Sequence, residues 1–319
     1  MKNKIVVYKK LPEDLLTYLE DKFEVRYFPN LNEQSYPKFL NEIKDAQGFL
    51  GSGLKIDQEI LNLAPDLKIV SNVSVGYDNL NVPELNRRGI MATNTPGVLT
   101  ETTADAVFSL VLAAARRVPE LDNYVKSGKW TASIDEELFG VDVHHKTIGI
   151  IGMGRIGQEV AKRAHLGFDM NVLYHSRTRK LEVEQKLAAT YCELDELLSQ
   201  SHFVCVMIPS TPTTEKLIGE RELQMMRSDA ILINGSRGKN IDETALIKAL
   251  KHQWILGAGL DVYEEEPINK DNPLLTLQNV VTLPHIGSAT KETRYKMAQL
   301  AIENLEKGLT GETPPNLIK

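Results

Sequence analysis

The chain has 319 residues and a formal net charge of −6, with 42% hydrophobic and 25% charged residues. This length suits two domains that each bury a core. The acidic balance disfavours a nucleic-acid or anionic-membrane surface, and no apolar stretch is long enough to cross a bilayer. The two cysteines are too few for a disulfide framework and lack metal-ligand spacing. We therefore expect a cytoplasmic protein with no metal, membrane or nucleic-acid partner.

From residue 4 to residue 93, short β-rich runs alternate with amphipathic stretches. Such alternation predicts a parallel sheet with helices on both faces. The expected strands are 5–8, 23–28, 48–50, 67–71 and 90–93, and the expected helices are 12–21, 35–44, 57–63 and 82–88. The sequence K-K-L-P follows the first strand, so this half has the doubly wound pattern without a dinucleotide signature.

A turn cluster at 94–97 predicts a hinge, and a helix over 101–117 follows it. This helix is apolar around most of its circumference, so it needs burial on more than one side. It belongs to a domain core, to a subunit interface, or to both.

The alternation resumes at residue 147 and is long enough for a complete dinucleotide-binding sheet. The expected strands are 147–151, 170–175, 203–208, 230–234, 255–260 and 280–283, and the expected helices are 158–164, 194–198, 221–226 and 243–251. A last helix over 291–307 is expected to end at Gly308, because glycine commonly terminates helices.

The first of these strands ends in G-M-G-R-I-G at 152–157 and continues into a helix. Gly152 permits the tight turn, Gly154 lets a pyrophosphate approach the backbone, and Gly157 lets the helix pack on the strand. The pyrophosphate would bind the free N–H groups at the start of the helix. Because a second strand follows, this pattern predicts dinucleotide binding rather than an ordinary turn.

The end of that second strand indicates which dinucleotide binds. NAD enzymes usually have an acidic residue there, but this chain has H-S-R-T-R-K at 175–180. Ser176, Arg177, Arg179 and Lys180 could bind a ribose 2′-phosphate, which favours NADP(H) while leaving NAD(H) possible. The alternative is a solvated run of charge.

Three later strands end in polar motifs: N-G-S-R-G at 234–238, D-V-Y-E-E-E-P at 261–267 and P-H-I-G-S at 284–288. Each residue has an ordinary surface explanation when it is taken alone. A cation, a carboxylate and an imidazole at successive strand ends of one sheet nevertheless indicate a catalytic site. In the first half, the loop S-V-G-Y-D at 74–78 also follows a strand, where anion binding and a plain turn are equal alternatives.

In this order, the motifs G-M-G-R-I-G, N-G-S-R-G, G-L-D-V-Y-E-E-E-P and L-P-H-I-G-S resemble those of the D-isomer-specific 2-hydroxyacid dehydrogenases. Within that family the chain is most similar to glyoxylate/hydroxypyruvate and 2-ketogluconate reductases. The resemblance implies Arg237 as substrate anchor, Glu266 as carboxylate partner and His285 as acid/base. It implies substrate contacts at Val75 and Gly76. The implied cofactor contacts are Thr103, Arg155, Ile156, Pro209, Thr213, Gly235, Asp261 and Gly287.

The resemblance also implies an α/β fold with two doubly wound parallel-sheet domains, in which a Rossmann cofactor domain is inserted in a flavodoxin-like substrate domain. We expect the substrate domain at 1–98 and 288–319, the cofactor domain at 99–287, and a homodimer. The expected activity is NAD(P)H-dependent reduction of small 2-keto acids, above all glyoxylate and hydroxypyruvate, to D-2-hydroxy acids by hydride transfer. Alternatives are 2-ketogluconate reductase, D-3-phosphoglycerate dehydrogenase and, from another class, a dinucleotide-sensing corepressor-like scaffold.

Overall fold

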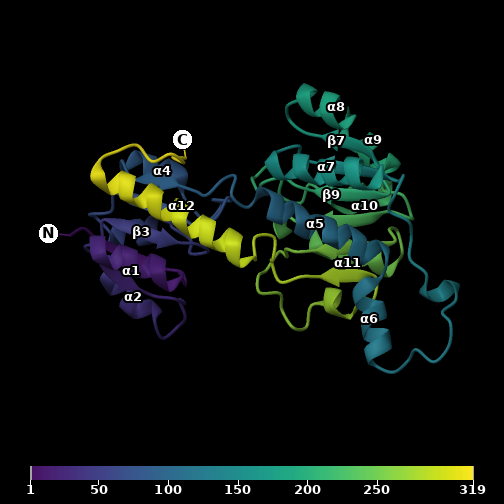
Figure 1. The fold of residues 1–319 in the computed structure, drawn as a ribbon, viewed down its shortest axis with the longest axis horizontal. Helices are drawn as coiled ribbons and strands as arrows, with labels where there is room; N and C mark the ends of the chain where they lie inside the picture. The colour runs from purple at the N-terminus through teal and green to yellow at the C-terminus, as the bar shows by residue number, and fades with distance from the viewer. Residues whose placement is uncertain (1, 319) are drawn as a thin grey trace. The chain divides into compact units, whose positions relative to one another are not determined.

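The computed structural model describes residues 2–318 and divides into two compact units (Figure 1). Unit 1 comprises Met1–Leu99 and Thr290–Lys319, and unit 2 comprises Thr100–Ala289. Each unit contains one sheet in which all neighbouring strands are parallel. The expectation of two doubly wound parallel sheets is therefore confirmed.

Unit 1 has a five-stranded sheet of order β2-β1-β3-β4-β5, which is the flavodoxin-like order. Its strands are β1 (Lys4–Tyr8), β2 (Glu24–Tyr27), β3 (Gly48–Gly51), β4 (Ile69–Asn72) and β5 (Met91–Thr93). Its helices are α1 (Glu13–Lys22), α2 (Tyr36–Glu42), α3 (Gln58–Leu63), α4 (Val82–Arg87) and α12 (Lys291–Thr310). The central strands are buried on both faces, which explains their continuous apolar runs.

The last helix, α12, packs on β3, β4 and β5 (Figure 1). The prediction that it ends at Gly308 was wrong, because Gly308 is buried inside the helix. A Cβ at Gly308 would lie 2.5 Å from Cδ1 of Ile69, so this glycine permits close packing on β4. The helix ends instead at Gly311, whose φ of +86° gives the left-handed cap typical of glycine.

Unit 2 has a seven-stranded sheet of order β12-β11-β10-β9-β6-β7-β8, the Rossmann order with one added strand. The strands are β6 (Thr147–Ile151), β7 (Asn171–His175), β8 (Thr190–Tyr191), β9 (Phe203–Val206), β10 (Ile231–Asn234), β11 (Gly257–Leu260) and β12 (Val280–Thr282). The α-helices are α5 (Thr100–Ala115), α6 (Val118–Lys126), α7 (Arg155–Phe168), α8 (Leu181–Leu187), α9 (Leu194–Gln200), α10 (Glu220–Met225) and α11 (Glu243–Lys251). Three 3₁₀ turns are η1 (Glu136–Leu138), η2 (Gly238–Asn240) and η3 (Pro273–Thr276).

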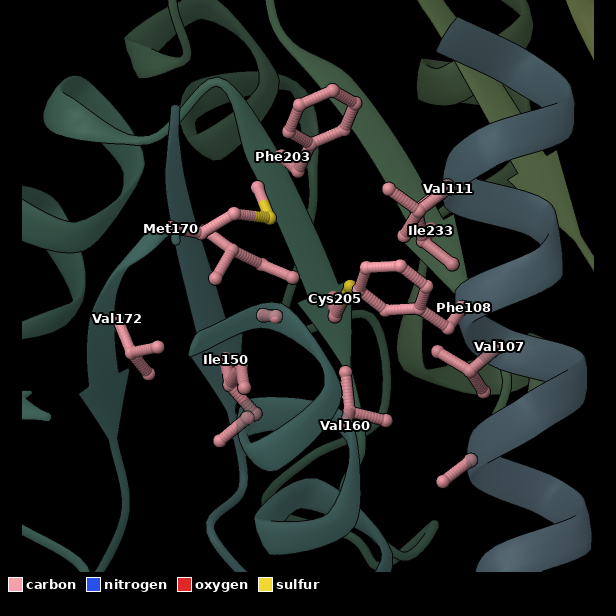
Figure 2. Packing of buried hydrophobic residues seen from close by; sticks show 14 of the residues in the cluster. Val107, Phe108, Val111, Ile150, Val160, Met170, Val172, Phe203, Cys205 and Ile233 are labelled. Atoms are coloured by element: carbon pink, nitrogen blue, oxygen red, sulfur yellow. The ribbon is translucent and has the colours of Figure 1, made fainter. Parts of the chain in front are cut away.

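The apolar helix α5 is a core helix of unit 2. It packs on α7, β10 and β11, and Figure 2 shows Val107, Phe108 and Val111 projecting from it among the buried side chains of the sheet, Cys205 and Ile233 included. Burial raises the pKa of the Cys205 thiol to about 12, so this thiol is inert. Elements of unit 2 thus bury most of the apolar surface of α5.

The sequence prediction omitted α6, α8 and β8. The helix α6 is only nine residues long, and none of its residues is buried. The strand β8 has two residues, which is too short for a periodic signal. Among residues 2–318, no helix combines the length and apolar character that a membrane span requires.

Candidate active site

The turn between β6 and α7 has the geometry that a bound pyrophosphate requires. Gly152 has a φ of +103°, which favours glycine. A Cβ at Gly157 would lie 2.2 Å from the carbonyl oxygen of Gly152, so only glycine allows α7 to approach the turn this closely. A Cβ at Gly154, the N-cap of α7, would meet no atom within 4 Å. The backbone of Arg155 and Ile156 follows in the first turn of α7, where N–H groups have no helical partner.

The basic turn after β7 separates into engaged and available side chains. Arg179 donates to both carboxylate oxygens of Glu184 at 2.7 and 2.8 Å, and this pairing, together with a hydrogen bond from Tyr174, lowers the pKa of Glu184 to about 2. Ser176 donates to the carbonyl of Thr178 at 2.8 Å. The guanidinium of Arg177 has no ion-pair or hydrogen-bond partner among the described residues.

The ammonium of Lys180 also has no ion-pair or hydrogen-bond partner among residues 2–318. The backbone N–H of Lys180 donates to the Tyr174 hydroxyl at 2.7 Å. The structure therefore leaves Arg177 and Lys180 as the cations that can face a 2′-phosphate. Arg179 would first have to leave Glu184.

The other expected cofactor residues in unit 2 also follow strand ends. Pro209, beyond β9, accepts hydrogen bonds from Thr214 and from Asn240 at 2.7 and 3.2 Å. Thr213 lies in the same turn, with its hydroxyl 3.1 Å from that of Thr211. At Gly235, beyond β10, a Cβ would lie 2.4 Å from Cγ2 of Val107. Glycine is thus needed there for α5 to pack on β10.

The two loops after β11 and β12 bring the predicted imidazole and carboxylate together. The Nδ1 atom of His285 lies 2.6 Å from Oε2 of Glu266, and Oε1 accepts a hydrogen bond from the backbone of Tyr263 at 3.1 Å. Burial alone would raise the pKa of the Glu266 carboxyl. The hydrogen bond and charge of His285, with the charge of Arg237, outweigh burial and lower it. Glu266 is therefore an ionised acceptor, which places a hydrogen on Nδ1.

The backbone at His285 is strained, and Asp261 holds the residues after it. His285 has a φ of +53°, a conformation that non-glycine residues rarely adopt and that concentrates at functional sites. The buried carboxylate of Asp261 accepts the N–H groups of Ile286 and Gly287 at 2.7 and 2.8 Å. Burial raises the pKa of Asp261, and these two hydrogen bonds oppose that rise. A Cβ at Gly287 would lie 3.2 Å from Cγ2 of Thr103, so Thr103 and Asp261 both border this loop.

Arg237 follows β10, and the backbone beside it meets the Glu266 loop. A Cβ at Gly238 would lie 1.8 Å from the backbone carbon of Tyr263, so only glycine lets these two loops touch. The amide of Asn234 donates to the carbonyl of Arg237 at 2.9 Å and fixes the turn. The charge of Arg237 also contributes to the lowered pKa of Glu266.

The comparisons with known proteins agree with this geometry. The model of the D-isomer specific 2-hydroxyacid dehydrogenase NAD binding domain matches residues 108–287. Glyoxylate/hydroxypyruvate reductase B of Yersinia pestis (strain Pestoides F) is 52% identical over 318 residues, with 100% of this chain and 98% of that protein covered. The chain belongs to the D-isomer-specific 2-hydroxyacid dehydrogenases.

Solved structures also support the assignment of this chain to the dehydrogenase family. The TT0316 protein from Thermus thermophilus is 41% identical with a TM-score of 0.92, over 99% of this chain and 100% of that chain. An NADPH-dependent glyoxylate/hydroxypyruvate reductase from Sinorhizobium meliloti, in complex with NADP and malonate, is 31% identical with a TM-score of 0.87, over 100% of this chain and 97% of that one.

In unit 1 of the dehydrogenase, the loop after β4 presents two backbone N–H groups. The carbonyls of Val75 and Gly76 accept hydrogen bonds from the amides of Asn94 and Asn72 at 2.8 and 2.9 Å. Their N–H groups donate to no acceptor among residues 2–318. Because the carbonyls are held, the loop keeps its N–H groups available to an anion.

Sequence reasoning missed two residues that build the site, Gly238 and Tyr263. The glycine next to Arg237 was visible in N-G-S-R-G, but its role depends on a contact with a loop about 25 residues later, as the close approach to Tyr263 shows. The hydroxyl of Tyr263 donates to the carbonyl of Leu283 at 3.0 Å and joins the Glu266 loop to the strand end before His285. No local pattern marks such a bond.

Proposed function

We propose that this dehydrogenase reduces small 2-keto acids, above all glyoxylate and hydroxypyruvate, to D-2-hydroxy acids, with NADPH as preferred reductant. The 2.6 Å contact between His285 and Glu266 carries the proposal, because it pairs a proton donor with the carboxylate that stabilises its charged form. Its relatives named glyoxylate/hydroxypyruvate reductase support this substrate class. 2-Ketogluconate is the second candidate substrate.

The proposed cofactor fits the described loops. Gly152, Gly154 and Gly157 would hold the pyrophosphate at the start of α7, and Arg177 with Lys180 would hold the 2′-phosphate. The Sinorhizobium meliloti relative in complex with NADP supports NADP(H), and the NAD binding family model leaves NAD(H) possible. Pro209, Thr213, Gly235 and Thr103 complete the proposed cofactor contacts.

The bound dinucleotide supplies a hydride to carbon 2 of the keto acid. The charge that develops on the carbonyl oxygen needs a cation and a proton, which Arg237 and His285 would provide. Glu266 accepts the hydrogen on Nδ1, so the Nε2–H of a protonated His285 is directed to the substrate oxygen. The side chain of His285 is 49% exposed and accessible to substrate and to the solvent that returns its proton. Asp261 and Gly287 would keep the His285 loop beside the nicotinamide.

The substrate carboxylate would be bound by two sets of donors. The guanidinium of Arg237 matches a carboxylate in charge and planar geometry. The N–H groups of Val75 and Gly76, held by Asn94 and Asn72, would bind it as well. On this proposal unit 1 is the substrate domain and unit 2 the cofactor domain.

We also propose a homodimer that acts in the cytoplasm. The segment 118–139 exposes Val118, Val125, Trp130, Ile134 and Phe139, with Trp130 61% exposed. Large apolar side chains gathered on one segment favour burial against a second copy. Both cysteines are free and buried, as expected in a reducing compartment. Sedimentation velocity on the wild type and on Trp130→Ser tests the dimer.

Turnover tests the proposed activity. Oxidation of NADPH, followed by its absorbance, is expected with glyoxylate and hydroxypyruvate and is compared with NADH and with 2-ketogluconate. No turnover with any of these acids would sink the proposal. NADPH binding without turnover would instead support the dinucleotide-sensing scaffold.

A further inference from the structure

A second cationic group lies at the carboxyl edge of the sheet in unit 1, outside the residues assigned so far. Lys9 follows β1, and its ammonium donates to the hydroxyl of Ser52, which follows β3, at 2.7 Å. Within residues 2–318, Lys9 has no carboxylate at ion-pair distance. A half-buried lysine without an acidic partner is unusual, because burying a charge is unfavourable.

The surroundings of Lys9 add to that cost. Burial and, second, the positive charge of Arg294 on α12 lower the pKa of Lys9 to about 8. The folded protein therefore binds this proton more weakly than the unfolded chain, so a charged Lys9 lowers stability at neutral pH. A ligand that supplies an oxygen acceptor to the ammonium would offset this cost in stability.

The position of Lys9 relative to the β4 loop indicates which ligand oxygen would accept a hydrogen bond from its ammonium. The strand order β1-β3-β4 makes the loops after these three strands neighbours. The N–H of Val73 donates to the carbonyl of Gly51, directly before Ser52, so the β4 loop stays joined to the end of β3. The ammonium of Lys9 contacts Ser52, the residue after Gly51, and is therefore held at the end of β3 to which the β4 loop is joined.

A three-carbon acid that carries an oxygen on carbon 3 has polar groups at both ends, so two neighbouring loops can bind it together. With the carboxylate on the N–H groups of Val75 and Gly76, carbon 3 would reach the region of Ser52 and Lys9. After donating to Ser52, the ammonium of Lys9 keeps two hydrogens for another acceptor.

We infer that Lys9, positioned by Ser52, binds an oxygen substituent on carbon 3 of the substrate and selects 3-hydroxy-2-keto acids over 2-keto acids with an unsubstituted carbon 3. This inference rests on the proposed function and deepens it. A site that donates to a substrate hydroxyl discriminates strongly against the analogue without it, because its polar group is then left without an acceptor. Hydroxypyruvate carries this oxygen, whereas pyruvate lacks it.

The test compares hydroxypyruvate and pyruvate with NADPH in the wild type, Lys9→Met and Ser52→Ala. We expect the wild type to favour hydroxypyruvate by about 100-fold in kcat/KM, and Lys9→Met to lower this ratio by about tenfold or more. Ser52→Ala should lower it less, because the ammonium remains. Lys10→Met is the matched control, since Lys10 is an exposed neighbour, and it should not change the ratio. Thermal denaturation and NADPH titration check the fold of each variant.

The outcomes separate this inference from the proposed function. Glyoxylate has no carbon 3, so its turnover by the wild type reports the basic activity. Turnover of glyoxylate with a hydroxypyruvate-to-pyruvate ratio unchanged by Lys9→Met overturns the role of Lys9 alone. A parallel loss with both acids also overturns it, because it indicates a structural lysine. Absence of turnover with all three acids overturns the proposed function and, with it, this inference.

Discussion

The two sheets follow the same doubly wound plan but differ at the point where their first strands end. In unit 2, β6 runs into Gly152 and the start of α7, where backbone N–H groups are open to a ligand. In unit 1, β1 runs into Lys9, and Pro12 caps α1 without a glycine turn. Glycine lets an anion reach the backbone, whereas Lys9 presents a side-chain cation. The strand order sets where a ligand binds, and the residues after each strand set which ligand it is.

The largest effect is expected when the proton donor of unit 2 is removed. His285→Ala should lower kcat by about 100- to 10,000-fold, the usual contribution of a general acid. NADPH affinity should stay the same, because the glycine turn does not depend on this ring. Steady-state kinetics and fluorescence titration of NADPH measure the two quantities. His144→Ala, an exposed histidine away from the site, is the control. A parallel loss of NADPH affinity would indicate a structural histidine.

The glycine turn itself provides the next test of the contrast between the sheets. Gly157→Ala would place a Cβ 2.2 Å from the carbonyl oxygen of Gly152, and the turn would have to move. We expect NADPH affinity to fall about tenfold or more, as a cost of roughly 1–3 kcal/mol implies. Gly167→Ala, in the same helix with open space around it, is the control and should leave affinity unchanged. Equal affinities of both variants would contradict the proposed role of the turn.

Arg177→Ala should distinguish the two dinucleotides. Loss of a charged hydrogen bond to the 2′-phosphate is expected to weaken NADPH binding about tenfold and NADH binding little. Arg227→Ala is a suitable control, because Arg227 is paired with Asp229 outside the turn. Isothermal titration with both dinucleotides measures the difference. If both lose affinity equally, Arg177 does not read the 2′-phosphate.

The smallest expected effect is a shift in pH dependence. The pKa of Glu266 is lowered in the folded protein, so its contribution to stability is present above the unfolded pKa and is lost as pH falls through the folded value. Glu266→Gln removes this carboxyl, so the loss of stability on acidification should be smaller in the variant, as thermal denaturation at acidic and neutral pH measures. Glu265→Gln, the exposed neighbour, serves as control. The same pH dependence of thermal stability in both variants would contradict this contribution of Glu266.

Much of the site was predictable because its motifs are local. The glycine turn, the basic turn after β7 and the three polar strand ends each occupy a few consecutive residues. A parallel sheet brings its strand ends to one edge, so Glu266 and His285 could be expected close together before their 2.6 Å contact was seen. The engagement of Arg179 by Glu184 was not predicted, since it depends on where α8 begins.

The sequence alone determined the alternation of strands and helices, the order of the motifs and the family, because hydrophobic period and glycine spacing are properties of neighbouring residues. Only the tertiary structure decided the pairings between distant residues. Gly308 lies within α12 because it packs on Ile69, and Gly238 is required because it meets Tyr263. Lys9 gained its proposed role through its contact with Ser52, 43 residues away in the chain. Such contacts follow from sheet register and packing, which no local pattern contains.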